Sequence, residues 1–280
     1  RSYLQQLIEP GHVRIRHRPV QTPSIRVRAG ESIAIELRPT PQTQAFKPEL
    51  IPLDIVYEDA HVLVLNKPAG LVVHPAPGNW SGTLLNGLLG RDPSAAMLPR
   101  AGIVHRLDKG TSGLMVVARS RQAMDRLVQD MAARAVRRQY LAIGHGCWGG
   151  SGACQVSAPI GRDPRNRLRM AVVDLNLHAG KSASTQIRLI ENGNACCLVE
   201  CTLQTGRTHQ IRVHMASLDH PLLGDTLYGG SPLGGLVRQA LHAYRLAFAH
   251  PVSAEVLTFH APIPGDMASA LESVGLRYNA

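Results

Sequence analysis

The sequence is poor in aromatic residues and cysteines, and it has no long hydrophobic run. Its 280 residues include two Trp, six Tyr, three Phe and five Cys. No uninterrupted apolar stretch approaches the ~18–20 residues that cross a bilayer, so we expect no membrane partner. The cysteines are odd in number and form no C-x-x-C pair, which favours buried free thiols and a cytoplasmic location over disulfides or zinc.

Several enzyme signatures are also missing. The sequence has no H-E-x-x-H pattern, and we therefore expect no metal site. It has no P-loop, no G-x-S-x-G nucleophile turn and no protein-kinase motif set, so we expect no nucleotide cofactor. These absences leave reactions that need neither a bound metal nor a nucleotide, together with simple binding functions.

Positive charge is what the sequence has in excess. It holds 30 Lys and Arg against 20 Asp and Glu, a formal net charge of +10, and its isoelectric point is about 9.9. A charge of this sign and size favours a polyanionic partner, most often a nucleic acid. A basic enzyme with some other substrate is the alternative at this point.

The chain is expected to comprise a small module over residues 1–38, a linker over 39–49 and a large domain over 50–280. The first segment has seven Arg and no Lys against three Glu. Four prolines lie between residues 39 and 52, and proline removes hydrogen-bond donors and stiffens the chain.

Alternating apolar and charged residues predict strands in the small module. Val13 and Ile15 alternate with Arg14 and Arg16, as on a half-buried strand. A second alternating pair of strands is expected around a turn at Ala29–Gly30. The exposed arginines suit either a solvated face or a small RNA-binding surface.

Strand-like runs cluster in the large domain, and helical runs are scattered between them. This order favours an α+β fold with a large mixed, mainly antiparallel sheet. The longest helical pattern spans residues 120–140, where Asp130 and Arg134 are spaced to pair on the outside. Helical spacing places five residues of this segment on its buried face: Met124, Leu127, Val128, Met131 and Ala135.

The first candidate for chemistry is Asp108, in GIVHRLDKGTSGL (102–114). Arg106 and Lys109 flank it, and nearby positive charge favours the ionised form of a carboxyl group. An ionised, partly desolvated carboxylate is a competent nucleophile or base. The same residues would also suit a charged surface turn, and the segment alone leaves both interpretations open.

A second segment, LQTGRTHQIRVH (203–214), gathers distinct hydrogen-bond donors on one short element. Arg212 lies beside the apolar Ile211, where an unpaired charge is costly. Arg212 therefore needs an anionic partner, and either Asp108 or a phosphate would serve. A basic helix face against solvent is the alternative.

Three further places could contribute to a nucleic-acid site. Tyr140 joins the helical segment to a strand, where its ring could pack in the core or stack on a base. Lys67, before a proline, indicates a rigid extended loop at a cleft edge. Arg162 and Arg165 belong to a basic loop (160–170) suited to a phosphate backbone.

Six segments, in order along residues 50–265, resemble the RluA family of RNA pseudouridine synthases. They are NKPAGLVVHP (66–75), HRLDKGTSGL (105–114), RRQYLAI (137–143), TGRTHQIRVH (205–214), HPLLGDTLYGG (220–230) and HAPIP (260–264). The resemblance implies the pseudouridine synthase fold, with a central catalytic cleft in its large sheet. Residues 1–38 resemble the alpha-L RNA-binding motif. Because the chain begins with Arg rather than Met, we expect the first helix of that motif to lie upstream.

The resemblance also implies residue roles. Asp108 matches the catalytic aspartate, Arg212 the arginine that pairs with it, and Tyr140 the tyrosine that stacks on the target base and can shuttle the proton. We expect these three residues to be catalytic. Arg106 matches the arginine that fills the gap left by the flipped uridine. We expect RNA contacts from a wider set as well: Lys67, His105, Arg207, His209, Gln210, Arg162, Arg165, Arg14 and Arg16.

The activity implied is isomerisation of uridine to pseudouridine in large-subunit ribosomal RNA, free or in a pre-ribosomal particle. The reaction breaks the glycosidic carbon–nitrogen bond and rejoins the base through carbon, so we expect a monomer that uses no cofactor. Three alternatives remain at this point: a C-type rRNA specificity within the same family, a non-catalytic rRNA-binding or assembly protein, and a nuclease that uses Asp108 with a histidine.

Overall fold

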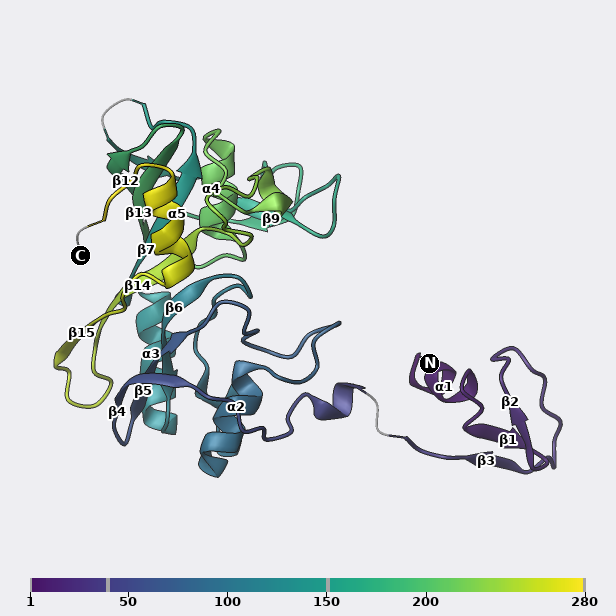
Figure 1. The fold of residues 1–280 in the computed structure, drawn as a ribbon. Coiled ribbons are helices and arrows are strands. Elements are labelled where there is room, and N and C mark those ends of the chain that lie inside the picture. Colours follow the sequence, from purple (N-terminus) through teal and green to yellow (C-terminus); the bar gives the residue numbers. More distant parts are fainter. Residues whose placement is uncertain (1, 39–40, 150–151, 279–280) are drawn as a thin grey trace. The chain divides into compact units, whose positions relative to one another are not determined.

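The computed structural model describes residues 2–38, 41–149 and 152–278. The chain divides into two compact units, one of residues 1–47 with 75–81 and one of residues 48–74 with 82–280 (Figure 1). Two residues of the expected linker, 39 and 40, lie outside the described residues. Its next residues form a short 3-10 helix, η1 (Pro41–Gln44).

The first unit is a helix and a small antiparallel sheet. Its elements are α1 (Ser2–Ile8), β1 (Val13–Ile15), β2 (Arg18–Val20) and β3 (Ile33–Ile35), with strand order β2-β1-β3. The β1–β2 turn has two consecutive residues with positive φ, Arg16 and His17, as a tight hairpin turn requires. Leu7, Val13 and Val20 are buried in this unit.

The second hairpin expected in this unit is wrong. β3 pairs with β1, and residues 25–28 form no strand. Ile25 and Val27 are about half exposed, so the apolar side chains of this segment do not pack against a core. Alternation predicts a strand only where one face of that strand is buried.

A nine-stranded sheet is the centre of the second unit. Its strands are β4 (Asp54–Glu58), β5 (Val62–Lys67), β6 (Ser112–Ala118), β7 (Arg137–His145), β8 (Ala153–Val156), β12 (Thr185–Asn192), β13 (Cys196–Leu203), β14 (Leu241–Ala249) and β15 (Val256–His260). Their order is β4-β5-β6-β14-β7-β13-β12-β8, and β15 pairs with β14. The β6–β14 pair is parallel and the other pairs are antiparallel. The mixed, mainly antiparallel sheet predicted from the sequence is confirmed.

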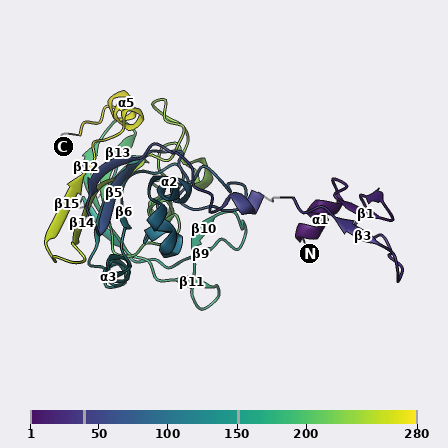
Figure 2. The ribbon, with the colours of Figure 1, turned by 90° about the horizontal axis from the view of Figure 1, so that it is seen from below.

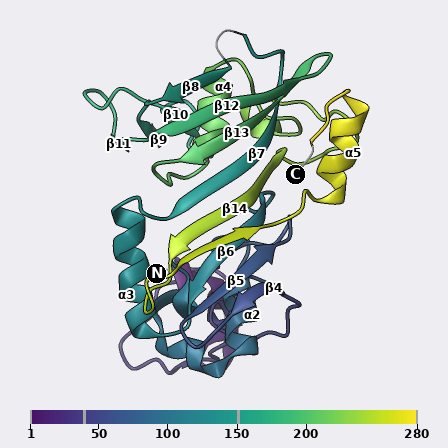
Figure 3. The ribbon, with the colours of Figure 1, turned by 90° about the vertical axis from the view of Figure 1, so that its left-hand side faces the viewer.

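Helices cover both faces of this sheet, as Figures 2 and 3 show from two sides. They are α2 (Leu84–Arg91), α3 (Arg121–Ala132), α4 (Gln210–Ser217) and α5 (Gly265–Ser273), with short 3-10 turns η2 (Pro93–Met97), η3 (Pro99–Gly102) and η4 (Thr226–Tyr228). Apolar residues of α2 and α4 share one core cluster, and those of α3 and α5 belong to two others. A small sheet, β10 (Met170–Val172), β9 (Ile160–Arg162) and β11 (Gly180–Lys181), completes the unit.

Helix α3 is shorter than its pattern predicts. It ends at Ala132, because Arg134 adopts a left-handed conformation with φ 62°. Val128, expected in the core, is 48 % exposed. Asp130 is buried and pairs with Arg126 at 3.0 Å rather than with Arg134. Since Arg134 has left the helix, the i, i+4 spacing no longer brings it beside Asp130.

The five cysteines are free thiols. Within the part of the chain that the structure describes, no helix has the length and apolar character needed to cross a membrane.

Candidate active site

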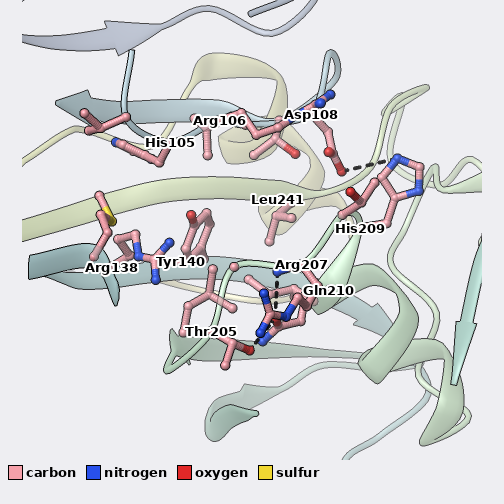
Figure 4. A pocket seen from close by; sticks show the side chains of 18 of the residues that line it. His105, Arg106, Asp108, Arg138, Tyr140, Thr205, Arg207, His209, Gln210 and Leu241 are labelled. Carbon is pink, nitrogen blue, oxygen red and sulfur yellow. Dashed lines mark hydrogen bonds and ion pairs between the residues drawn. The ribbon is translucent and has the colours of Figure 1, made fainter. Parts of the chain in front are cut away.

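A cavity of about 480 Å³ opens in the second unit, beside the sheet (Figure 4). Its walls come from the segment after η3, from β7, and from the turn that leads into α4. The cavity brings together the three residues predicted as catalytic, Asp108, Tyr140 and Arg212, although they are far apart in the chain. It is also lined by five of the residues expected to contact RNA: His105, Arg106, Arg207, His209 and Gln210.

Asp108 faces Arg212 of α4 and His209, the residue before α4, rather than its sequence neighbours. Its Oδ2 accepts a hydrogen bond from Arg212 Nη1 at 3.1 Å, and His209 Nε2 lies 3.9 Å away. Within the described chain, neither Arg106 nor Lys109 forms an ion pair with it. The contact between Asp108 and Arg212 that the sequence allowed is therefore present, and it holds the carboxylate in the cavity wall.

Arg212 has a second acidic partner that sequence reasoning missed. Asp225 accepts from Arg212 Nε at 2.7 Å and from Nη2 at 2.8 Å, a bidentate pair that is almost fully buried. The ring of Tyr228 lies under the guanidinium at 4.9 Å. Burial acts to lower the pKa of Arg212, but its bonds and charge interactions with Asp225 and Asp108 raise the pKa overall. The only signal for Asp225 was its place in the segment 220–230.

The surroundings of His209 favour its neutral form. Burial lowers its pKa, although the charge of Asp108 opposes that effect. The hydroxyl of Tyr228 accepts from the Met170 amide, so its own hydrogen is free to bond His209 Nδ1 at 2.7 Å. When Tyr228 donates to Nδ1, the ring hydrogen is on Nε2, the nitrogen that faces Asp108.

Tyr140 forms part of the cavity wall with Leu241, another residue that sequence reasoning missed. Both side chains are about 4 % exposed. Burial raises the pKa of Tyr140, so its hydroxyl stays protonated at neutral pH. That hydroxyl makes no hydrogen bond within the described chain. The ring and Leu241 give the cavity an apolar surface beside the charged group of Asp108.

Lys67 does not lie at a cleft edge, and the prediction that it contacts RNA is wrong. Its side chain is fully buried, and Nζ donates to the carbonyls of Pro68, Leu71 and Lys109 at 2.8, 3.0 and 3.4 Å. Burial lowers its pKa to about 7. Because Lys109 follows Asp108, the Lys67 amine anchors the loop that carries the carboxylate.

Gln210 lines the cavity and is also used inside the fold, and its contact with RNA stays a prediction. Its amide oxygen accepts from Thr205 Oγ1 and the Arg207 amide, and its nitrogen donates to Ser184 and Thr185. Both ends of the amide are therefore occupied. Gln210 shapes the turn that precedes α4.

His105 lines the cavity without a charge. Burial and the charge of Arg138 lower its pKa to about 3, and its Nε2 accepts from the Val116 amide. The remaining contacts stay predictions. Arg106 is exposed at the cavity, Arg162 and Arg165 are exposed around the β9–β10 loop, and Arg14 and Arg16 are exposed in the first unit.

Residues 61–217 match the family model described as RNA pseudouridylate synthase. This chain belongs to that family. Curated relatives named ribosomal large subunit pseudouridine synthase D cover nearly all of it. The relative from Neisseria meningitidis serogroup A is 50 % identical over 99 % of this chain and 75 % of its own length. The relative from Escherichia coli O6:H1 is 44 % identical over 97 % and 85 %.

Solved structures agree with this membership. Human RNA Pseudouridylate Synthase Domain Containing 1 has a TM-score of 0.60 and 28 % identity, over 76 % of this chain and 84 % of that chain. Human RNA Pseudouridylate Synthase Domain Containing 4 has a TM-score of 0.63 at 23 % identity, over 81 % and 95 %. The second likeness concerns the fold alone. The pseudouridine synthase fold expected from the sequence is confirmed.

Proposed function

We propose that this chain isomerises specific uridines to pseudouridine in large-subunit ribosomal RNA, with Asp108 acting on a flipped-out nucleotide. The observation that carries the proposal is the Asp108 carboxylate, bound by Arg212 in a cavity that also contains Tyr140. The relatives support the choice of RNA because their names specify the large ribosomal subunit. The C-type specificity within the same family is the alternative.

The chemistry needs an ionised carboxylate beside the nucleotide. Attack on the anomeric carbon, addition to the base ring and elimination to a glycal all share that requirement. The Arg212 guanidinium stabilises the negative charge of Asp108, and Asp225 fixes the guanidinium from its other side. The geometry of the carboxylate is therefore set before RNA binds, which lowers the cost of reaching the reactive arrangement.

Base flipping is assigned to Tyr140 and Arg106. Removing a base from its stack costs a few kcal/mol, and an aromatic ring offsets part of that cost by stacking. Since burial raises the pKa of Tyr140, its hydroxyl stays protonated and is not available as a general base, and we assign the ring to stacking. Arg106 is exposed at the cavity, where it can occupy the space that the uridine leaves.

The remaining assignments concern partners and location. We assign RNA binding to the first unit, whose Arg14 is exposed, and to the β9–β10 loop. In that loop Arg169 is tied to Asp163, while the Arg165 side chain is exposed. We propose that the protein is a cytoplasmic monomer. We also propose that it uses no cofactor, because the isomerisation involves no redox change and no phosphoryl donor.

The test is tritium release from large-subunit rRNA labelled at carbon 5 of uridine. We expect the wild type to release tritium, and Asp108→Asn to lower the rate on the order of 10³-fold or more while RNA affinity stays within a few-fold. An active Asp108→Asn variant would reject the assignment of Asp108. An inactive wild type that binds rRNA would favour an assembly protein, and fragments on a denaturing gel would favour a nuclease.

A further inference from the structure

Arg138 is a buried cation that the fold leaves without a partner. It lies on β7 and is 8 % exposed. Its Nε is sealed from solvent and makes no hydrogen bond. Across the described residues, no carboxylate pairs with its guanidinium. Burying an unpaired charge is costly, so a fold that keeps one in a cavity wall has a use for it.

The position of Arg138 relates it to the proposed reaction. Arg138 and Tyr140 are two residues apart on one strand, so their side chains share a face about 7 Å apart. Both line the cavity, as Figure 4 shows. A Cβ atom at Gly206 would lie 2.8 Å from Arg138 Nη1. The side-chain-free Gly206 therefore leaves room for the guanidinium head.

The charges around the cavity identify the class of ligand. The carboxylates of Asp108 and Asp225 both contact Arg212, and neither forms an ion pair with Arg138. A neutral carbonyl of the base would also leave its charge unbalanced. A phosphodiester group supplies a full negative charge and two oxygens for a guanidinium. Between a base carbonyl and a backbone phosphate, the charge favours the phosphate.

We propose that Arg138 binds a backbone phosphate flanking the flipped uridine, and thereby positions the nucleotide between Tyr140 and Asp108. This inference rests on the proposed function. A nucleotide whose base contacts Tyr140 can span the ~7 Å between residues i and i+2 of the strand. The phosphate contact would then fix the sugar, and with it the anomeric carbon, relative to the Asp108 carboxylate.

Activity and stability together separate this role from a structural one. We expect Arg138→Met to lower kcat/KM about 10- to 100-fold, as loss of a charged hydrogen bond does, and Arg138→Lys to recover part of it. Thermal stability of Arg138→Met should be unchanged or higher, because no buried partner is left unpaired. Arg137→Met, on the exposed neighbouring residue of β7, is the matched control and should match the wild type.

The phosphate itself is tested with a synthetic RNA that contains a mapped target uridine. A neutral methylphosphonate replaces one flanking phosphate at a time. We expect one replacement to slow the wild type about 10-fold or more, and the same replacement to leave Arg138→Met unaffected, because coupled groups are not additive.

Two results would overturn the inference. In the first, Arg138→Met keeps wild-type activity, or loses stability and activity together without recovery by lysine. In the second, every flanking replacement slows the wild type and Arg138→Met equally, or slows neither. A wild type that releases no tritium from large-subunit rRNA rejects the proposed function instead, so the two failures are distinguishable.

Discussion

Arg212 and Arg138 line the same cavity and are both more than nine-tenths buried, yet their charges are balanced differently. Arg212 binds Asp225 and Asp108, whereas Arg138 has no acidic partner in the described chain. The first guanidinium is part of a prebuilt arrangement that fixes the carboxylate. The second is available for an anion from outside the protein. In this site, the arginine with acidic partners organises the protein, and the arginine without one is free to bind a ligand.

The largest effect on stability should come from removing Arg212, the arginine that has acidic partners. Arg212→Met leaves the buried carboxylate of Asp225 and that of Asp108 without their cation. We expect a loss of roughly 3–5 kcal/mol in the free energy of unfolding and loss of isomerisation. Denaturant unfolding of Arg212→Met and Arg138→Met, side by side, measures the contrast. Equal stability of the two variants would remove the distinction between the two arginines.

The next effect concerns the buried amine under the catalytic loop. Lys67→Met leaves the carbonyls of Pro68 and Leu71 without this donor, and we expect a loss of about 2 kcal/mol. Activity should fall with it, because Lys67 also bonds the carbonyl of Lys109, next to Asp108. Denaturant unfolding measures the loss of stability, and tritium release measures the loss of activity. Full activity in Lys67→Met would show that the loop needs no such anchor.

Lys67 also makes stability depend on pH. Its pKa is about 7 in the fold, against an ordinary value of 10.5. Between these values the unfolded chain binds a proton that the folded chain does not, so stability rises with pH. Relative to Lys67→Met, the wild type should gain up to about 1 kcal/mol per pH unit between pH 7 and 9. A constant difference between the two proteins over that range would contradict the lowered pKa.

The smallest effect should come from an exposed arginine. Arg165 is exposed in the β9–β10 loop, where a phosphate contact would be screened by water and salt. We expect Arg165→Gln to weaken RNA binding a few-fold and to reduce the salt dependence of the affinity by about one ion, with kcat unchanged. Arg277→Gln, exposed after α5, is the control. An equal loss in both variants would indicate non-specific charge.

The sequence indicated the contact between Asp108 and Arg212, but it did not indicate the second acidic partner of Arg212. The charge beside Ile211 indicated only that Arg212 needs an anion, and the family resemblance matched it to Asp108, 104 residues away. The same argument could not find Asp225, because several acidic residues were available and only the tertiary fold selects one. Arg138 was also invisible, since a missing partner shows only when every neighbour is in place.

Local patterns failed where tertiary contacts overrode them. Helical spacing placed Val128 in the core, but the structure buries Asp130 and leaves Val128 exposed. A lysine before a proline indicated a cleft edge, but burial and three carbonyls made Lys67 an internal anchor. The large sheet was predictable, because its nine strands each leave a run of apolar residues in the sequence, and one misplaced side chain does not remove that signal.

The most direct test maps pseudouridines in large-subunit rRNA from cells that lack this protein. The account predicts that particular pseudouridines disappear, that the wild-type gene restores them, and that the Asp108→Asn gene does not. Unchanged pseudouridines in the cells that lack the protein, or restoration by Asp108→Asn, would contradict it.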